Sequence, residues 1–277
     1  MRVVRTIAEL ETAPATGLVP TMGALHAGHV ALLRAARQES SRVVMSLFVN
    51  PAQFDEQADL AAYPRDEARD LEIAEAEGVD VVFAPAADEL YPPGFATWVD
   101  PGETGAEGAA RPGHFRGVAT VCLKLFDVVR PSRAYFGQKD AQQLAVIRRL
   151  VRDLNVPVEI RAVPTVRDPD GLAVSSRNRY LSAAERTTAL ALPRALRAGR
   201  EAQEAGPEAV LKAAGAVLDE AATAAPPLVT DYLSLADPGT FTPVAAGYAG
   251  EALLLAAVRV GGTRLIDNMQ LMLGDQS

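Results

Sequence analysis

The chain has 277 residues, 49% of them hydrophobic and 22% charged, with a formal net charge of -8 and a pI near 5.0. This length is enough for a substantial core in one large domain or two smaller ones. The acidic balance argues against nucleic acid as a partner, because a broad nucleic-acid surface needs clustered Lys and Arg. The single cysteine excludes an internal disulfide and favours a cytoplasmic location. No apolar leader opens the sequence and no apolar run reaches about 18 residues, so neither secretion nor a membrane span is expected.

Short apolar runs alternate with stretches of helical periodicity over residues 1–165. This alternation predicts right-handed βαβ crossovers and a parallel sheet, so we expect an α/β, Rossmann-like nucleotide-binding domain. The segment 91–117 is rich in Pro and Gly and holds at most a short strand near residues 95–99, and a loop of this length is usually functional. The expected strands are 17–19, 42–49, 79–84, 133–136 and 158–163, and the expected helices are 30–36, 66–77, 117–129 and 141–154.

A smaller C-terminal α+β domain is expected over residues 166–277. Asp168-Pro169-Asp170-Gly171 is a strong turn signal, and Gly261-Gly262 is typical of a β-hairpin. Alanine-rich stretches favour helices, and runs of apolar residues near the end favour strands. The expected helices are 183–205 and 208–224, and the expected strands are 229–235, 252–260 and 264–273.

The segment from Pro20 to His29 joins the first strand of the predicted sheet to the first helix. Its two glycines allow a tight turn, and a helix start offers unpaired N–H groups that suit phosphate. Two of the three histidines of the chain, His26 and His29, lie here. A simple connecting loop with a capping histidine is the alternative. A zinc site is disfavoured, because the chain adds only one histidine and one cysteine as further soft ligands.

Two other polar loops follow strands of the same predicted sheet. Residues 50–54 come after one strand and residues 137–140 after another. Ligands of open parallel sheets bind beyond the carboxyl ends of the strands. We therefore expect both loops to gather on the same edge as the histidine loop.

Five motifs in order resemble those of one enzyme family. His26-Ala27-Gly28-His29 has the form of the HIGH signature of adenylyl-transferring enzymes, and Val174-Ser175-Ser176-Arg177 lies where their second, KMSKS-like loop is expected. With these and the other motifs, the chain closely resembles the pantothenate synthetase (pantoate–β-alanine ligase) family. The other motifs are Asn50-Pro51-Ala52-Gln53-Phe54, Tyr63-Pro64-Arg65 and Gly137-Gln138-Lys139-Asp140-Ala141-Gln142-Gln143, and the second loop extends over Ser175-Ser176-Arg177-Asn178-Arg179-Tyr180-Leu181. A weaker likeness lies at Leu265-Ile266-Asp267-Asn268.

The resemblance implies ATP-dependent condensation of pantoate with β-alanine through a pantoyl-adenylate, with release of AMP and pyrophosphate. It also implies a homodimer that uses Mg²⁺. The carboxylate of pantoate is already ionised at neutral pH, so the first step needs alignment and stabilisation of charge rather than a general base.

The resemblance also assigns catalytic roles. His29 takes the position of a proton donor, with His26 beside it against the phosphates; Lys139 supplies a point charge, and Arg177 belongs to a mobile clamp with Ser175 and Ser176. For the clamp the alternative is a plain surface loop, and for Lys139 a solvated lysine. The implied ATP-binding residues are Met22, Gly23, Ala24, Leu25, His26, Ala27, Gly28, His29, Gly137, Gln138, Lys139, Asp140, Val166, Val174, Ser175, Ser176 and Arg177.

Gln53 and Gln143 match positions that hold pantoate, and Gln53 also lies near the β-alanine position. An amide suits a hydroxy acid because it both donates and accepts hydrogen bonds; without the resemblance, each would be read as a surface glutamine. Asp70 is a candidate for the magnesium shell, with an exposed helix carboxylate as the alternative. Asp140 has a helix cap as its alternative role.

Two positions depart from the family pattern: Val174 stands where methionine is common, and Arg116 where a smaller or acidic residue is frequent. We hypothesise that the segment 91–117 and the Arg177 loop help to close the site over the adenylate.

The competing hypotheses for the function are an adenylyl or cytidylyl transferase with another acceptor, and a non-enzymatic nucleotide sensor. A class I aminoacyl-tRNA synthetase remnant is disfavoured by length and by the acidic charge.

Overall fold

The computed structural model describes residues 1–54, 57–102 and 105–274, which form two compact units. The first unit holds the described residues up to 102 with Arg111–Gln138 and Gln143–Pro164. The second holds residues 165–274 with the short segments 105–110 and Lys139–Gln142. The domain boundary expected between residues 165 and 166 stays a prediction, and each unit is described by itself below.

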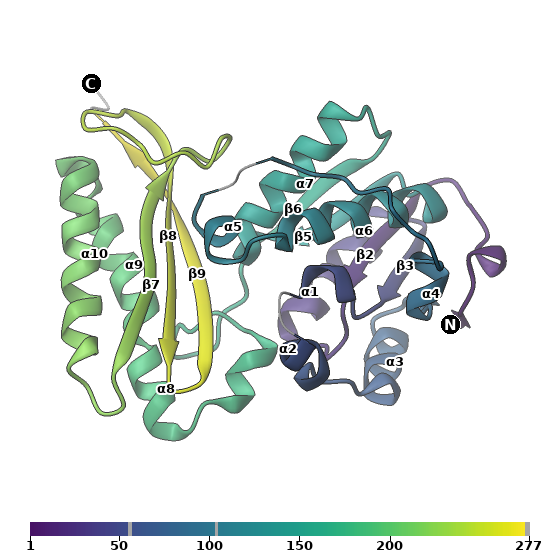
Figure 1. The fold of residues 1–277 in the computed structure, drawn as a ribbon, viewed down its shortest axis with the longest axis horizontal. Coiled ribbons are helices and arrows are strands. Elements are labelled where there is room, and N and C mark those ends of the chain that lie inside the picture. The colour runs from purple at the N-terminus through teal and green to yellow at the C-terminus, as the bar shows by residue number, and fades with distance from the viewer. Residues whose placement is uncertain (55–56, 103–104, 275–277) are drawn as a thin grey trace. The chain divides into compact units, whose positions relative to one another are not determined.

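The first unit is built on a six-stranded parallel sheet, which confirms the predicted fold class (Figure 1). The first strand was not predicted, because only one of its three residues is buried and it shows no periodicity. In spatial order the strands are β1 (Arg2–Val4), β4 (Val81–Phe83), β3 (Arg42–Leu47), β2 (Thr16–Thr21), β5 (Arg133–Gly137) and β6 (Glu159–Val163).

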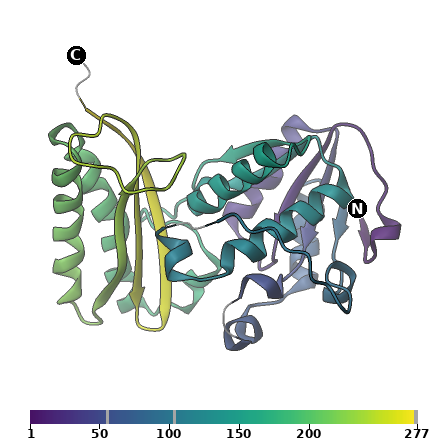
Figure 2. The same cartoon turned by 45° about the horizontal axis from the view of Figure 1, so that its top comes forward.

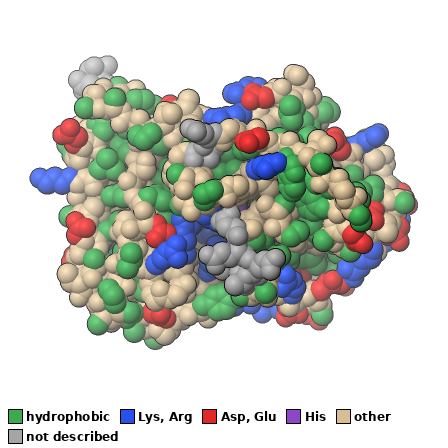
Figure 3. Space-filling model, in the orientation of Figure 1, with side chains coloured by type: hydrophobic (Ala, Val, Ile, Leu, Met, Phe, Trp, Pro, Cys, Tyr) green, Lys and Arg blue, Asp and Glu red, His purple; other side chains and the backbone are tan. Residues whose placement is uncertain are grey.

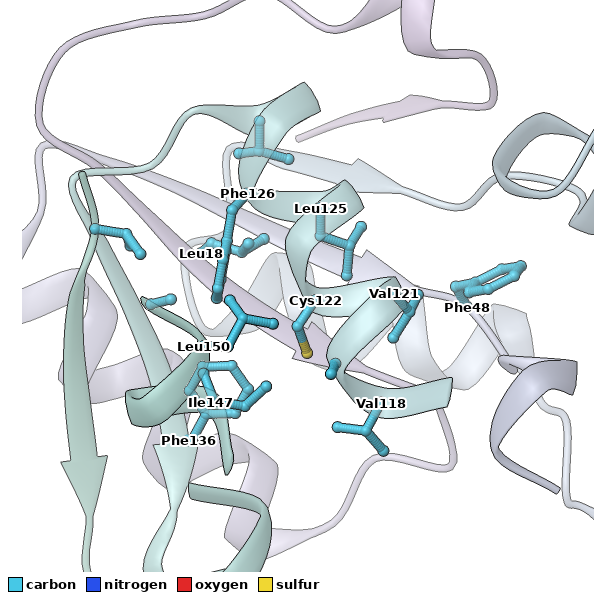
Figure 4. Close-up of a cluster of buried hydrophobic side chains, with 14 of the residues drawn as sticks. Leu18, Phe48, Val118, Val121, Cys122, Leu125, Phe126, Phe136, Ile147 and Leu150 are labelled. Atoms are coloured by element: carbon cyan, nitrogen blue, oxygen red, sulfur yellow. The ribbon is translucent and has the colours of Figure 1, made fainter. Parts of the chain in front are cut away.

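Helices cover both faces of this sheet, because neighbouring residues of a strand point to opposite sides. Leu18 belongs to a core built with α6 and α7, whereas Val19 belongs to a core built with α1 and α3 (Figure 4 shows the first). The helices of this unit are α1 (Ala27–Glu39), α2 (Gln57–Ala62), α3 (Glu67–Ala76), α4 (Ala87–Leu90), α6 (His114–Val129) and most of α7 (Ala141–Asp153), with short 3₁₀ helices η1 (Ile7–Glu9) and η2 (Pro51–Gln53). The 3₁₀ helix η3 (Gln138–Asp140) begins in this unit, and its last two residues belong to the second.

Cys122 lies on α6 and points into the first core (Figure 4). Burial raises the pKa of its thiol to about 12, so the thiolate is scarce at pH 8. We expect the folded protein to resist a thiol reagent such as Ellman's reagent at pH 8, and the protein unfolded in guanidinium to react with one equivalent. Fast labelling of the folded protein would contradict the burial of this side chain.

The second unit packs helices on one face of a three-stranded antiparallel sheet (Figures 1 and 2). The two-residue turn Gly261-Gly262 joins β8 and β9 as expected, with Val260 paired to Thr263. The elements are α5 (Glu107–Ala110), η4 (Ser176–Tyr180), α8 (Ala183–Ala189), α9 (Ala191–Glu201), η5 (Gln203–Ala205), α10 (Pro207–Ala222), β7 (Leu228–Ala236), β8 (Gly250–Val260) and β9 (Thr263–Leu273).

The helix expected over residues 183–205 is divided in the structure. α8 ends at Ala189 and α9 begins at Ala191. Pro193 has no N–H to donate to the carbonyl of Ala189, so the hydrogen-bond ladder is interrupted at that point.

The described surface mixes both signs of charge. On the face drawn in Figure 3, Lys and Arg side chains lie among Asp and Glu side chains, with hydrophobic ones between them. Within the residues that the structure describes, every helix is too short or too polar to cross a membrane.

Candidate active site

The histidine loop leaves the sheet where its strand order reverses. β2 lies between β3 and β5, so the chain continues to β3 and β4 on one side and to β5 and β6 on the other. Ligands of open α/β sheets bind at such a switch point, beyond the carboxyl ends of the strands. The loop after β2 therefore lies where the topology favours a ligand.

Asp70 holds the backbone of this loop. It comes from α3, is only 2% exposed, and accepts the N–H groups of Ala24 at 2.8 Å and Leu25 at 2.7 Å. Gly23 and Ala24 both have positive φ, 83° and 52°, a conformation that costs energy at the alanine. A Cβ on Gly23 would lie 2.8 Å from Oδ2 of Asp70, so glycine is needed there.

The alternative reading of Asp70 as an exposed helix carboxylate is wrong, because the side chain is buried. Burial raises the pKa of Asp70, and its hydrogen bonds from Leu25 and Ala24 act in the opposite direction. Both of its oxygens accept amide protons, so its contacts in the structure are with the loop. Its role as a magnesium ligand stays a prediction.

We expect Asp70→Asn to destabilise the fold by about 1–3 kcal/mol, because the amide nitrogen would face a backbone N–H and leave a buried donor unsatisfied. Denaturant unfolding measures this change. Glu72→Gln, at an exposed position of the same helix, is the matched control and should stay within about 0.5 kcal/mol of the parent chain. Equal stability of the two variants would contradict the role given to Asp70.

His26 and His29 cap the start of α1 with the same ring nitrogen. Nδ1 of His26 accepts the N–H of Gly28 at 3.1 Å, and Nδ1 of His29 accepts the N–H of His26 at 3.3 Å. The two ring centroids are 4.1 Å apart. An Nδ1 atom that accepts a hydrogen bond carries no proton, so each neutral ring carries its proton on Nε2. Capping and donation to a ligand thus use different nitrogens.

Gln53 is held in one orientation by its neighbours. It ends η2, is 8% exposed, and its Oε1 accepts a hydrogen bond from Nδ2 of Asn50 at 3.0 Å. Asn50 also donates to the carbonyl of Gly117 at 3.2 Å and accepts from the hydroxyl of Tyr91 at 2.8 Å. The surface-glutamine reading is therefore wrong for Gln53, and its amide nitrogen is turned away from Asn50.

His114 and Arg111 fix the backbone of Gln53 as well. Nδ1 of His114 lies 2.9 Å from the Gln53 carbonyl oxygen, and Arg111 donates to the same oxygen at 3.1 Å. From the sequence, Arg111 and His114 were expected near the site only as part of the segment 91–117, and Asn50 only as part of the loop 50–54. None of the three was assigned a role of its own, although an asparagine before a proline is a common start of a helix. The contacts of His114 and Arg111 with Gln53 span about sixty positions, for which the sequence offers no local signal.

The loop after β5 and the start of the next helix carry several residues that were predicted to bind ATP or pantoate. Gly137 ends the strand, Lys139 lies in η3, and Gln143 lies in the first turn of α7. The Lys139 side chain is only 19% exposed, and its Nζ is 3.9 Å from Oδ1 of Asp140. Lys139 is therefore partly buried rather than fully solvated, and Asp140 is its ionic neighbour.

A short hairpin in the second unit brings three predicted ATP-binding residues together. The N–H of Val174 donates to the carbonyl of Val166 at 3.0 Å, on either side of the turn 168–171. Ser175 follows directly, and its hydroxyl accepts the N–H of Arg177 at 3.3 Å. The Arg177 side chain is exposed, as both a clamp and a plain surface loop would require.

The described residues show no group of three or more His, Cys, Asp and Glu side chains placed to hold a metal ion.

Comparison with known proteins gives one consistent family. The family model described as pantoate-beta-alanine ligase matches residues 2–270. The pantothenate synthetase of Thermobifida fusca (strain YX) is 58% identical over 264 residues, which cover 92% of this chain and 89% of the relative. The pantothenate synthetase of Roseiflexus sp. (strain RS-1) is 55% identical over 281 residues, covering 98% and 99%.

Solved structures agree with the sequence comparisons. The crystal structure of pantothenate synthetase from Thermus thermophilus superposes with a TM-score of 0.90 at 49% identity and covers 97% of this chain and 99% of its own. The pantoate-beta-alanine ligase from Francisella tularensis, complexed with beta-gamma ATP and beta-alanine, has a TM-score of 0.78 at 32% identity and covers 97% of each chain.

Proposed function

Because the chain belongs to the pantoate–β-alanine ligase family, it is an ATP-dependent ligase that forms pantothenate, and we propose which of its residues perform each step. One observation carries the proposal: two histidines at the start of α1 keep Nδ1 for the helix cap, in a loop that Asp70 holds at the switch point of the sheet. The proposal also takes support from the beta-gamma ATP and beta-alanine in the Francisella tularensis complex.

In the first step a carboxylate oxygen of pantoate attacks the α-phosphorus of ATP. The new P–O bond gives pantoyl-adenylate, and the bond to the β-phosphate oxygen breaks, so that pyrophosphate leaves. His26 and His29 donate from Nε2 to phosphate oxygens as negative charge builds up. Lys139 and Arg177 supply positive charge, which is the usual way in which proteins accelerate this chemistry.

Gln53 and Gln143 align pantoate for that attack. The oxygen of the Gln53 amide is already engaged by Asn50, so the amide presents its N–H groups to the substrate. Two N–H donors suit a carboxylate or a hydroxyl oxygen. The orientation of Gln53 thus suits the oxygen atoms of pantoate, which accept hydrogen bonds.

In the second step the neutral amine of β-alanine attacks the acyl carbon and forms the carbon–nitrogen bond, AMP leaves with the electrons of the carbon–oxygen bond, and the amine nitrogen loses one proton to solvent. We propose that Gln53 also contacts β-alanine. The ATP-binding set otherwise stays as predicted from the sequence, from Met22 to His29, from Gly137 to Asp140, and at Val166 and Val174 to Arg177.

Magnesium enters the proposal as part of the substrate, MgATP. The described residues form no group of three or more His, Cys, Asp and Glu side chains placed to hold a metal ion, so we propose no metal site made by the protein alone. Both oxygens of Asp70 accept backbone N–H groups, and its role as a magnesium ligand stays a prediction. Mg²⁺ commonly keeps its waters and binds through nucleotide phosphates. We further propose a homodimer in the cytoplasm, without nucleic acid as a partner.

ATP–pyrophosphate exchange with Mg²⁺ and pantoate, without β-alanine, tests the proposed first step. We expect exchange that depends on pantoate, followed by pantothenate and AMP when β-alanine is added. Protein that is folded and binds ATP, yet shows exchange only with another carboxylate or a phosphate ester, would favour a transferase with a different acceptor. ATP binding with no exchange for any acceptor would favour a nucleotide sensor.

A further inference from the structure

The last strand carries two buried polar residues that the proposed mechanism does not use. Asp267 is 2% exposed and Asn268 is 9% exposed, both on β9 in the second unit. A buried carboxylate and a buried amide each cost free energy unless hydrogen bonds satisfy them. Their partners therefore show what these two side chains do.

Asn268 holds the backbone of Lys139. Its Nδ2 donates to the carbonyl oxygen of Lys139 at 2.8 Å, although the two residues are 129 positions apart. Lys139 lies in η3, a short helix with no ladder of its own beyond one turn. The amide of Asn268 therefore supplies a fixed point for a segment whose lysine must meet a phosphate.

Asp267 holds the hairpin that leads to the Ser-Ser-Arg loop. Its two oxygens accept hydrogen bonds from the two terminal nitrogens of Arg167 at 2.6 and 2.9 Å. This bidentate geometry fixes the orientation of the guanidinium group. Arg167 in turn donates to the carbonyl of Gly171 at 3.2 Å, across the turn of the hairpin. The carboxylate is fully buried, so this pair is well shielded from water.

The two neighbouring residues of β9 thus hold two separate segments. Asn268 reaches the loop of Lys139, and Asp267 reaches Arg167, which directly follows Val166 and leads through the turn to Val174 and Ser175. We propose that Asp267 and Asn268 are positioning residues for ATP, which set the places of Lys139 and of the Val166–Val174 hairpin. This inference rests on the proposed function, because that proposal gives Lys139 and the hairpin their contacts with the nucleotide.

A double-mutant cycle tests whether Asn268 acts through Lys139. ATP affinity is measured by titration calorimetry for Asn268→Ala in the parent chain and in Lys139→Ala. We expect the dissociation constant to rise about tenfold in the parent chain, as a lost buried hydrogen bond typically allows, and less than twofold in Lys139→Ala. Equal losses in both backgrounds would overturn the inference for Asn268.

Matched variants separate positioning from loss of fold. Gln270→Ala, an exposed amide on the same strand, should leave ATP affinity within twofold. Asn268→Leu keeps a side chain of similar volume without the donor, and should weaken ATP as Asn268→Ala does if the latter folds poorly. The KM for pantoate in the exchange assay should stay within twofold in the Asn268 variants, and a change as large as that for ATP would overturn the positioning role.

Asp267→Asn provides the complementary result. Because Asp267 acts through Arg167, its loss of ATP affinity should be the same with and without Lys139. A parent chain that binds ATP but shows no pantoate-dependent exchange would refute the proposed function alone, since the affinity cycle would still decide the roles of Asp267 and Asn268. A parent chain that binds no ATP would overturn both.

Discussion

His29→Ala should lower pantoate-dependent ATP–pyrophosphate exchange on the order of 10²-fold, the usual effect of removing one donor that stabilises a transition state. In the structure Nδ1 of this ring accepts the N–H of His26 at 3.3 Å. In the proposed mechanism Nε2 donates its proton to a phosphate oxygen. The alanine variant loses both, so it also loses part of the helix cap, worth about 0.5–2 kcal/mol. Exchange rate and denaturant unfolding together measure the two losses.

His29→Asn separates these functions. The asparagine oxygen can accept the N–H of His26 as Nδ1 does, but the side chain has no donor at the distance of Nε2. We expect His29→Asn to be as slow in exchange as His29→Ala and nearly as stable as the parent chain. Gln38→Ala, at an exposed position near the end of the same helix, should leave exchange within twofold. A loss below tenfold in a stable His29→Asn protein would remove His29 from the proposed chemistry.

The sequence predicted the parallel sheet because its strands are continuous apolar runs between helical stretches. Prediction from the sequence failed for elements that form through packing and strand pairing rather than through a periodic pattern of apolar residues. β1 is three residues long with one buried side chain, and it exists because it pairs with β4 from Arg2 to Val4. The break after Ala189 could have been predicted from the sequence, because Pro193 lies in the predicted helix and lacks the N–H that a continuous helix needs there.

The candidate site likewise contains residues with a local sequence pattern and residues whose role depends on contacts between distant parts of the chain. Residues 26–29 could be proposed from the sequence because one short segment carries both histidines, the turn and the start of the helix. The role of Asp70 was not found, because the loop that it holds lies 45 and 46 positions away in the chain. Sequence spacing suggested a carboxylate with a metal or in solvent, whereas burial under the loop gives it two backbone N–H groups as partners. A contact of that range is fixed by the fold and has no local pattern.

Gly117→Ala should be strongly destabilising, although alanine favours helices over glycine by about 1 kcal/mol. Gly117 lies in α6, where a Cβ would be 2.1 Å from the carbonyl oxygen of Ala52 and 2.7 Å from the backbone nitrogen of Gln53. These are backbone atoms of η2, so the steric clash can be removed only if this short helix, which carries Gln53, moves. We expect a loss of about 1–3 kcal/mol, as for other overpacked sites, measured by denaturant unfolding.

The same displacement should weaken pantoate more than ATP. The carbonyl of Gly117 accepts Nδ2 of Asn50, which also orients the amide of Gln53, so a shift of η2 disturbs both the position and the orientation of that amide. We expect KM for pantoate to rise at least about tenfold while ATP affinity by calorimetry changes much less, because a misplaced binding group costs roughly one hydrogen bond to substrate.

Gly215→Ala is the matched control for this substitution. Gly215 also lies inside a long helix, but its Cβ would meet only a leucine side-chain carbon at 3.8 Å, an ordinary contact. We expect this variant to be more stable than the parent chain by about 0.4–1 kcal/mol, with both KM values unchanged. The two glycines should therefore give effects of opposite sign on stability. A Gly117→Ala protein that is as stable as the parent chain and binds pantoate normally would show that η2 tolerates movement and that the close approach of α6 does not place Gln53.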